Sequence, residues 1–428
     1  MIGTVYIHLL AVYRFMKSSA SHGKTVKSAF LVILMIIMTQ VGYLDLINSP
    51  RTGNDSFDEE STVMETGGSG SSFAYANNKM SAGYQHTCAI LDNGDLKCWG
   101  EDSYGQLGDG GGIMGTNAPS STAIDLGPGR TAVAVSAGYQ HTCAILDNGE
   151  LKCWGRDFEG QLGNGGSNTH TQAPSSTAID LGSGRTAVAV SAGHTHNCAI
   201  LDNGDVKCWG WDSYGMLGDG GSNDATTEPS STAIDFGSGR TAVTVAIGYQ
   251  HSSAIHDNGD LKCWGDDAWG QLGDGAGSAS GLNAPSSTAI DLGSGRTAVA
   301  VAAGREHTCA ILDNGDLKCW GRDNNGQLGD GGTTHAYSTH TTAPSSTAID
   351  LGSGRTAVAV SAGHHHTCVI LDNGEVKCWG QGGFGQLGDV ALYQTLSPAP
   401  SSTAIDLGSG RTAVAMFAGE YHTCAILD

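Results

Sequence analysis

The sequence is poor in basic residues, in proline and in aromatic side chains. It has 21 Lys and Arg against 42 Asp and Glu, a formal net charge of −21, 9 prolines and 7% aromatic residues. The charge lies in the second part of the chain, because residues 1–80 hold six basic and six acidic residues while residues 81–428 hold 15 and 36. A surface of this sign repels phosphate backbones, so we expect no nucleic-acid partner. A solvated acidic surface that keeps the protein soluble explains the excess.

The motifs of the common enzyme classes are also absent from the sequence. It contains no nucleophile elbow, phosphate-binding loop or metalloprotease helix. Every candidate acid, base or nucleophile recurs in several copies, whereas catalysis needs one asymmetric arrangement. We therefore expect no enzyme, no cofactor and no metal, with an active site assembled in a central channel as the alternative. Beyond residue 80 no segment has a useful helical apolar period, which predicts an all-β domain.

What the chain has instead is one block that occurs six times. The first copy reads His86-Thr-Cys-Ala-Ile-Leu-Asp-Asn-Gly-Asp-Leu-Lys-Cys-Trp-Gly100, and a seventh copy that starts at His422 stops at Asp428. Successive blocks are preceded by glycines that lie 55, 55, 55, 56, 59 and 56 residues apart, at positions 83, 138, 193, 248, 304, 363 and 419. A fixed period of this size indicates stacked supersecondary units, none of which buries its apolar face alone.

Each block is predicted to form a β-hairpin. The segments on either side of Asp92-Asn-Gly94 alternate apolar and polar residues with the period of strands, and this tripeptide is a strong turn sequence. A three-residue loop places Cys88 opposite Cys98 on a non-hydrogen-bonded rung, close enough for a disulfide. A two-residue loop places Cys98 opposite Ala89 instead. The disulfide and the three-residue loop are therefore one hypothesis.

Five repeats carry the complete cysteine pair. The fourth repeat has Ser253 opposite Cys263, and Cys424 of the incomplete copy has no partner. Reduced buried thiols are the alternative, while a metal site is disfavoured because the spacing lacks the short cysteine pairs of zinc sites. Disulfides agree with an exported protein. The predicted disulfides are Cys88–Cys98, Cys143–Cys153, Cys198–Cys208, Cys309–Cys319 and Cys368–Cys378.

The N-terminus has the pattern of an export signal. Three lysines, at positions 17, 24 and 27, precede an apolar run that extends over residues 29–44. We predict a signal peptide or signal anchor over residues 1–47, with residues 29–44 as the membrane anchor if it is not cleaved and with the repeats outside. A buried helix of a separate domain is the other interpretation, and Met16 is an alternative start to Met1. Residues 48–80 are predicted to be a flexible acidic linker rich in Gly and Ser.

The rest of each repeat also contains segments that recur in the copies. After the hairpin comes Trp99-Gly-x-Asp-x-x-Gly-Gln-Leu-Gly108, and Pro119–Leu126 and Arg130–Val135 follow as two more strand-like segments. Four short strands in each unit are what a propeller blade contains. We expect the histidine that opens each block to be structural and bonded to backbone groups. We expect the repeated aspartates to cap backbone amides of their loop, and these are Asp102, Asp157, Asp212, Asp267 and Asp323.

The repeat contains three characteristic runs, Gly-x-x-His-Thr-Cys-Ala-Ile, Asn-Gly-Asp-Leu-Lys-Cys-Trp-Gly and Gly-Gln-Leu-Gly-Asp-Gly. In these runs the sequence resembles the regulator of chromosome condensation repeat family and also alpha-tubulin-suppressor-like repeat proteins. The resemblance covers residues 81–428 and implies a circular β-propeller, usually of seven blades. In that family's phasing, residues 93–428 make six full units, so either the reading frame is truncated or the ring closes differently. The founding member is a nuclear exchange factor for the small GTPase Ran, and guanine-nucleotide exchange is the alternative function that the resemblance implies.

Three places vary among the otherwise nearly invariant repeats: the pair before the histidine, the four residues after Trp-Gly, and the loop after Gly-Gln-Leu-Gly. The first two flank the open end of the hairpin, so they lie at one end of every blade. Aromatic and Arg side chains on such a face are typical of binding surfaces, with drift of unconstrained loops as the alternative. We therefore predict an exported or cell-surface, non-enzymatic scaffold for a protein or glycan. The candidate binding residues are Tyr104, Trp211, Tyr214, Trp269, Arg305 and Phe384.

Overall fold

A computed structural model of the chain describes residues 65–66 and 79–428, apart from 113, 168, 222–224, 238, 278–280, 333–339 and 389–395. All of these residues belong to one compact unit, Thr62–Asp428. The predicted signal or anchor at 1–47 and nearly all of the linker at 48–80 lie outside the described residues. Every regular element in the described part is a strand. Among these same residues, no helix is long and apolar enough to cross a membrane.

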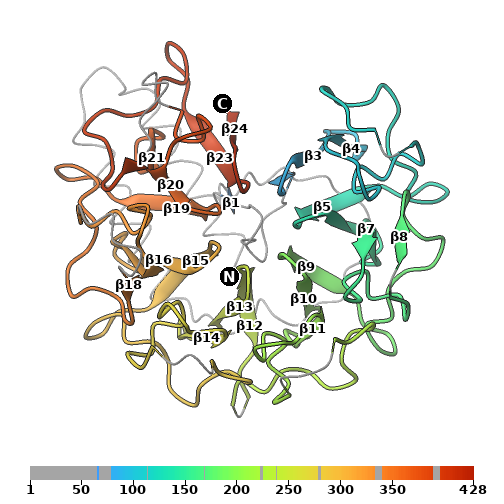
Figure 1. The fold of residues 1–428 in the computed structure, drawn as a ribbon, viewed down its shortest axis with the longest axis horizontal. Coiled ribbons are helices and arrows are strands. Elements are labelled where there is room, and N and C mark those ends of the chain that lie inside the picture. Colours follow the sequence, from blue (N-terminus) through green and yellow to red (C-terminus); the bar gives the residue numbers. More distant parts are fainter. Residues whose placement is uncertain are drawn as a thin grey trace, which may run out of the picture. The chain divides into compact units, whose positions relative to one another are not determined.

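The strands form seven sheets, which follow one another around a centre in chain order (Figure 1). The first three sheets consist of β2 (Met80–Ala82), β3 (His86–Ile90) and β4 (Leu96–Gly100); β5 (Ala132–Ala137), β6 (His141–Leu146), β7 (Leu151–Asp157) and β8 (Thr169–Thr171); and β9 (Ala187–Ala192), β10 (His196–Leu201) and β11 (Val206–Gly210). The next three consist of β12 (Ala242–Ile247), β13 (His251–His256) and β14 (Leu261–Gly265); β15 (Ala298–Ala303), β16 (His307–Leu312), β17 (Leu317–Arg322) and β18 (His340–Thr341); and β19 (Ala357–Ala362), β20 (His366–Leu371), β21 (Val376–Gln381) and β22 (Leu396–Ser397). The seventh contains β23 (Ala413–Ala418) and β24 (Thr423–Leu427), and β1 (Glu65–Thr66) runs parallel to β23.

The hairpins have the register that the three-residue loop predicts. Cys88 lies opposite Cys98 in the β3–β4 pair, and the Leu91 N–H donates to the Asp95 carbonyl at 2.9 Å. Gly94 closes the loop with a φ of 82°, a conformation that glycine adopts without a steric penalty. The structure contains all five expected disulfides. In the fourth sheet, Ser253 donates a hydrogen bond to the Cys263 sulfur at 3.0 Å instead.

One of the two further strand predictions is wrong. Residues 119–126 form no strand, although the segment from Arg130 onward leads into β5 as expected. The backbone N–H of Ile124 donates one hydrogen bond to the Leu96 carbonyl, and the Ile124 and Leu126 side chains are buried. The segment is therefore held by its apolar side chains and not by the backbone hydrogen bonds of a paired strand. The fourth strand comes earlier, as β8, β18 or β22. Elsewhere it is reduced to a single bridge, at Thr116, Thr226 or Leu282.

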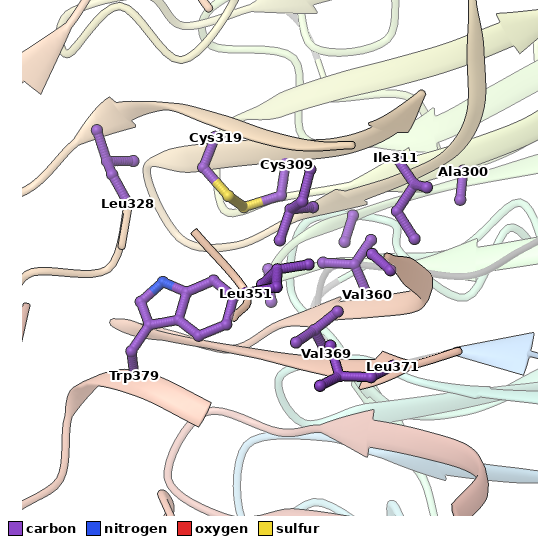
Figure 2. Close-up of a cluster of buried hydrophobic side chains, with 14 residues drawn as sticks. Ala300, Cys309, Ile311, Cys319, Leu328, Leu351, Val360, Val369, Leu371 and Trp379 are labelled. Atoms are coloured by element: carbon purple, nitrogen blue, oxygen red, sulfur yellow. A yellow bond between two sulfur atoms is a disulfide. The ribbon is translucent and has the colours of Figure 1, made fainter. Parts of the chain in front are cut away.

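The hydrophobic core lies between neighbouring sheets. The middle strands β6, β10, β13, β16 and β20 are buried along their whole length, because a sheet covers each of their faces. Figure 2 shows one such layer, in which Trp379 of the sixth sheet lies near Leu328 and the Cys309–Cys319 disulfide of the fifth. The Trp379 indole is fully buried and donates to the Gln327 carbonyl at 3.0 Å. Each such layer therefore joins the hairpin of one sheet to the indole of the next.

The histidine that opens each block bonds to a side chain of the following sheet, and not to backbone groups as expected. The His86 Nε2 atom lies 2.9 Å from the Thr142 hydroxyl. Because that hydroxyl donates to the Gln106 carbonyl at 2.8 Å, it accepts a hydrogen bond from the His86 Nε2–H. The last of these bonds, from His422 to Thr87, closes the ring between the seventh and first sheets. The others join His141 to Asn197, His196 to Ser252, His251 to Thr308, His307 to Thr367 and His366 to Thr423.

Candidate binding face

Two of the variable places, the pair before the histidine and the four residues after Trp-Gly, lie side by side at the open end of each hairpin. The backbone N–H of Glu101 donates to the carbonyl of Gln85 at 2.8 Å, and the equivalent bond joins Trp211 to Thr195 at 3.0 Å. Because the hairpin turn fixes the opposite end, every blade presents these two positions toward the same end of the ring. We call this end the variable face.

The first residue of each variable pair belongs to a series of neighbouring side chains around the centre. This axial ring consists of Tyr84, Tyr139, His194, Tyr249, Arg305, His364 and Glu420. Its aromatic members contact one another at centroid distances of 4.0–4.4 Å, and the Arg305 guanidinium lies 4.8 Å from the Tyr249 ring centroid. Backbone bonds to the neighbouring sheet accompany Tyr84, Tyr139 and Tyr249, and the bond from the Glu420 N–H to the Gly83 carbonyl, at 3.2 Å, joins the seventh sheet to the first.

One arc of the axial ring concentrates ionisable groups. Arg305 Nη1 donates to His364 Nε2 at 2.8 Å, and burial, together with the charge of Arg305, lowers the pKa of His364 to about 3. Burial raises the pKa of Glu420 to about 8, although Arg305 acts in the other direction. The Glu420 carboxyl is 6% exposed and lies 3.9 Å from His364. At neutral pH this arc therefore carries the charge of Arg305 beside a neutral imidazole and a mostly protonated carboxyl group.

The outer loops surround the axial ring with further aromatic contacts. Tyr104 packs edge-on against Phe158 at 5.7 Å, and Arg156 lies 5.1 Å from the Phe158 ring. The Arg322 guanidinium lies 4.4 Å from the Trp269 ring. Such cation–π pairs stabilise the observed placement of these rings by about 0.5–1 kcal/mol at exposed sites.

Phe384 links the outer loops to the axial ring. Its ring is 68% exposed and contacts Tyr421 at 4.9 Å. Tyr421 in turn contacts Tyr84 at 5.7 Å and His364 at 5.4 Å. An exposed aromatic side chain thus continues directly into the axial ring.

The structure places all six predicted residues on the variable face but in different surroundings. Arg305 lies in the axial ring and Phe384 joins it through Tyr421, whereas Trp211 and Tyr214 lie in the loop after the third hairpin and are 39% and 37% exposed. The axial ring was not predicted as a unit from the sequence. The signal was available in the first member of each variable pair, but its meaning depends on ring closure.

The repeated aspartates hold five of the loops after Trp-Gly, as predicted, whereas the loop that carries Phe384 has Gly382 at this position. The Asp102 carboxylate accepts the Leu107 N–H at 2.9 Å, and the same bond recurs in four more repeats, at Asp157, Asp212, Asp267 and Asp323. Burial raises the pKa of Asp102 to about 6 and that of Asp323 to about 7. Each carboxylate fixes its loop against the scaffold, which allows the neighbouring positions to vary.

Within the residues that the structure describes, no group of three or more His, Cys, Asp and Glu side chains is placed to hold a metal ion.

Replacing Glu420 by Gln is expected to stabilise the protein in alkaline solution. Because the folded-state pKa is raised from 4.5 to about 8, the stability that this group contributes is complete below pH 4.5 and is lost as the pH rises through 8. Glu420→Gln removes this dependence, so the two proteins should agree near pH 4.5 and differ by a few kcal/mol at pH 8. Urea unfolding from pH 5 to 9 measures the difference.

The control is Glu306→Gln, which breaks the ion pair with Arg322 and is expected to destabilise the protein. A Glu420 variant that is not more stable at pH 8 would contradict the assignment.

The sequence model described as "Regulator of chromosome condensation (RCC1) repeat" matches residues 93–145, 148–200, 203–255, 258–311, 314–370 and 373–426. The chain is 29% identical over 353 residues to the ultraviolet-B receptor UVR8 of Arabidopsis thaliana, covering 82% of this chain and 74% of that protein. It is 28% identical to the human E3 ubiquitin-protein ligase HERC2, covering 72% of this chain but 6% of that protein. Prp20p from Saccharomyces cerevisiae has a similar fold, with a TM-score of 0.67, 20% identity and 81% of each chain covered.

Proposed function

The chain belongs to the regulator of chromosome condensation (RCC1) repeat family, and we propose that it is an exported, non-enzymatic propeller that binds a protein partner through the variable face. The observation that carries the proposal is the aromatic and Arg composition of that face, where Trp211, Tyr214 and Phe384 are exposed on a rigid scaffold. Exposed aromatic and Arg side chains are enriched among the residues that dominate protein–protein binding energy. A receptor, UVR8, is among the relatives, which agrees with a binding role.

Two observations support export. The five disulfides are stable in an oxidising compartment and rare in the cytosol. The basic and apolar segments at the N-terminus have the order of an export signal. Denaturing alkylation of the protein isolated from its own cells, without reductant, should label Cys263 and Cys424 only. Labelling of all 12 cysteines would place the propeller in a reducing compartment and overturn this part of the proposal.

Binding by the variable face is tested with labelled propeller on intact cells of the source organism. Trp211→Ala, Tyr214→Ala and Phe384→Ala combined should weaken saturable binding at least about tenfold, because truncating a single residue that dominates an interface already costs about 2 kcal/mol or more. Arg130→Ala with Arg296→Ala is the matched control at the turn end, where both side chains form exposed ion pairs. Trypsin treatment of the cells should remove the binding. Equal binding by all three proteins contradicts the proposal, and binding that survives trypsin but not periodate assigns the face to a glycan.

A further inference from the structure

In the second repeat, one carboxylate of the variable face joins an arginine to a buried glutamine. Arg156 is the first residue of the loop after Trp-Gly, and Gln161 belongs to the Gly-Gln-Leu-Gly run that ends this loop. Glu159 Oε1 accepts from Arg156 Nη2 at 2.9 Å, and Glu159 Oε2 accepts from the Gln161 side-chain amide at 3.1 Å. The Glu159 side chain is 13% exposed. This carboxylate therefore satisfies two donors that are largely shielded from water.

The fifth repeat has the same two donors but no carboxylate between them. Arg322 and Gln327 are the equivalent arginine and glutamine, and Asn325 stands where the second repeat has its glutamate. The Asn325 side chain is one methylene shorter, and its amide nitrogen donates to the Asn324 side chain at 3.3 Å. The Gln327 amide nitrogen has no hydrogen-bond partner within the described structure, and the residue is 0% exposed. A buried donor of this kind requires an acceptor.

The two glutamine amides have the same orientation. Gln161 Oε1 accepts the backbone N–H of Glu159 at 2.9 Å, and Gln327 Oε1 accepts the backbone N–H of Asn325, also at 2.9 Å. Since the amide oxygens are fixed in the same way, the amide nitrogens face the same side of the loop. The Gln327 nitrogen is therefore directed at the place where the Glu159 carboxylate lies in the second repeat.

The other repeats show that the fifth loop is a special case. In the fourth repeat, Asp266 at the start of the loop accepts from the Gln271 amide at 2.8 Å, and the third repeat has Met216 in place of the glutamine. The loops with an unpartnered amide that begin with an acidic or neutral residue are those of Gln106 after Glu101 and Gln386 after Gln381. Among the six described loops, the fifth therefore combines an arginine with an unpartnered glutamine amide and no acidic residue at the positions that supply the carboxylate elsewhere.

A second arginine adds positive charge to this place. Glu306 forms ion pairs with Arg322 Nη1 and, at 3.6 Å, with Arg305 Nε, so two guanidinium groups share one carboxylate. Arg322 lies 4.4 Å from the Trp269 ring, which holds its plane in position. Its Nε atom has no hydrogen-bond partner within the described residues. The side chains of Arg305 and Arg322 are 31% and 17% exposed, so an anion can reach them from the surface.

We propose that the loop of the fifth repeat is a carboxylate subsite of the variable face, which receives an acidic side chain of the protein partner. The carboxylate occupies the place that Glu159 takes in the second repeat. The Gln327 amide and the Arg322 guanidinium donate to it, and Arg305 adds charge. Hydrogen bonds between ionised groups are shorter and stronger than neutral ones, so such a contact fixes the orientation of a partner. This inference rests on the proposed function, because it assigns a residue type to the partner.

Propionate tests the subsite without the partner, because it has the atoms of a Glu side chain. Titrated into the full-length protein labelled with nitrogen-15, it should shift the Gln327 side-chain amide and Arg322 Nε–H signals in the NMR spectrum and saturate at millimolar concentrations. Propionamide, which has the same shape but no charge, should leave both signals in place. Gln327→Met identifies the amide signal by its absence and should weaken propionate binding at least about fivefold. The chain itself tolerates Met at this position in the third repeat.

Two reciprocal variants provide matched controls. Asn325→Glu gives the fifth loop the carboxylate of the second, so it should abolish the propionate shifts and move unfolding to a higher urea concentration. Glu159→Asn should do the reverse in the second loop, where propionate should then shift the Gln161 amide signal. Absence of saturable shifts in the parent protein, or equal shifts in the Asn325→Glu variant, would overturn the subsite and leave the proposed function standing.

Binding to intact cells tests whether the partner supplies the carboxylate. Asn325→Glu should weaken saturable binding at least about tenfold, because it fills the subsite and opposes the partner's charge. The variant with Arg130→Ala and Arg296→Ala should again bind like the parent protein. Propionate binding together with undiminished cell binding by Asn325→Glu would assign the subsite to a free carboxylate and overturn the partner's role. Cells that bind no propeller at all would contradict the proposed function instead, and the propionate result would still decide the subsite.

Discussion

Lowering the pH from 7 to 4 is expected to unfold the propeller in one steep transition. Six histidines at the interfaces between sheets are 0–1% exposed. Burial lowers the pKa of each to about 3 or 4. Their Nδ1 atoms have no hydrogen-bond partner within the described structure, so a second ring proton would be buried without an acceptor. The six are His86, His141, His196, His251, His307 and His366.

The direction of the effect follows from proton linkage. In the unfolded chain these histidines titrate near 6.5, so between pH 6.5 and about 4 the unfolded state binds more protons and stability falls with the pH. Burial also lowers the pKa of His194, His256, His364 and His365, which adds to the fall in stability. The raised pKa values of Asp102, Asp157, Asp266, Asp323 and Glu420 act in the opposite direction over part of this range. Because the histidines outnumber these carboxyl groups, the free energy of unfolding should fall by roughly 1 kcal/mol per pH unit for each histidine in excess.

Urea unfolding at half-unit intervals from pH 4 to 8 measures this slope. His196→Gln is the informative variant, since a Gln amide can still donate to Ser252 but binds no proton. The slope of unfolding free energy against pH measures the protons taken up on unfolding, and this number should be smaller by about one in the variant than in the parent protein. A free energy of unfolding that stays constant between pH 7 and pH 4 would show that the histidines are not buried in their neutral form.

Truncation of an interface tryptophan should have the second large effect. Trp209 is 0% exposed, lies against Gly163 and donates to the Gln161 carbonyl at 3.1 Å. Trp209→Ala removes this bond and leaves a cavity between two sheets, at an expected cost of about 3–5 kcal/mol. The chain provides its own control, because Trp99 has the same sequence context but is partly exposed. Trp99→Ala should cost well under half as much in urea unfolding, and equal losses would mean that burial does not govern the contribution.

The parts of the fold that depend on local chemistry could be predicted from the sequence. Asp92-Asn-Gly94 predicted the hairpin turn, and the three-residue loop, one of the two loop lengths considered, predicted Cys88 opposite Cys98, as the structure has it. Residues 119–126 were wrongly predicted to form a strand, because the spacing of their apolar residues was interpreted as that of a strand paired in a sheet. Ile124 and Leu126 are instead buried between sheets, and a packed loop can show the same apolar spacing as a strand.

The parts that depend on ring closure could not be predicted from the pattern. The axial ring joins residues about 55 positions apart, and its last contact connects Glu420 to Gly83. The partner of His86 is likewise Thr142, 56 residues away. Nothing in a single repeat indicates which side chain of the next unit meets its histidine. For the candidate residues, only their common placement at the open end of the hairpin followed from the register.

The short span of the disulfides has a consequence for how such a chain reaches its fold. Nearly identical repeats invite mispairing during folding, because a strand from one unit fits the corresponding place in another. Each disulfide joins cysteines ten residues apart, so it can form as soon as its own hairpin forms. Once oxidised, the two strands can no longer separate and exchange partners individually. Among the complete hairpins only the fourth, in which Ser253 faces Cys263, has no disulfide. Correct pairing of its strands depends on the turn and the packing alone.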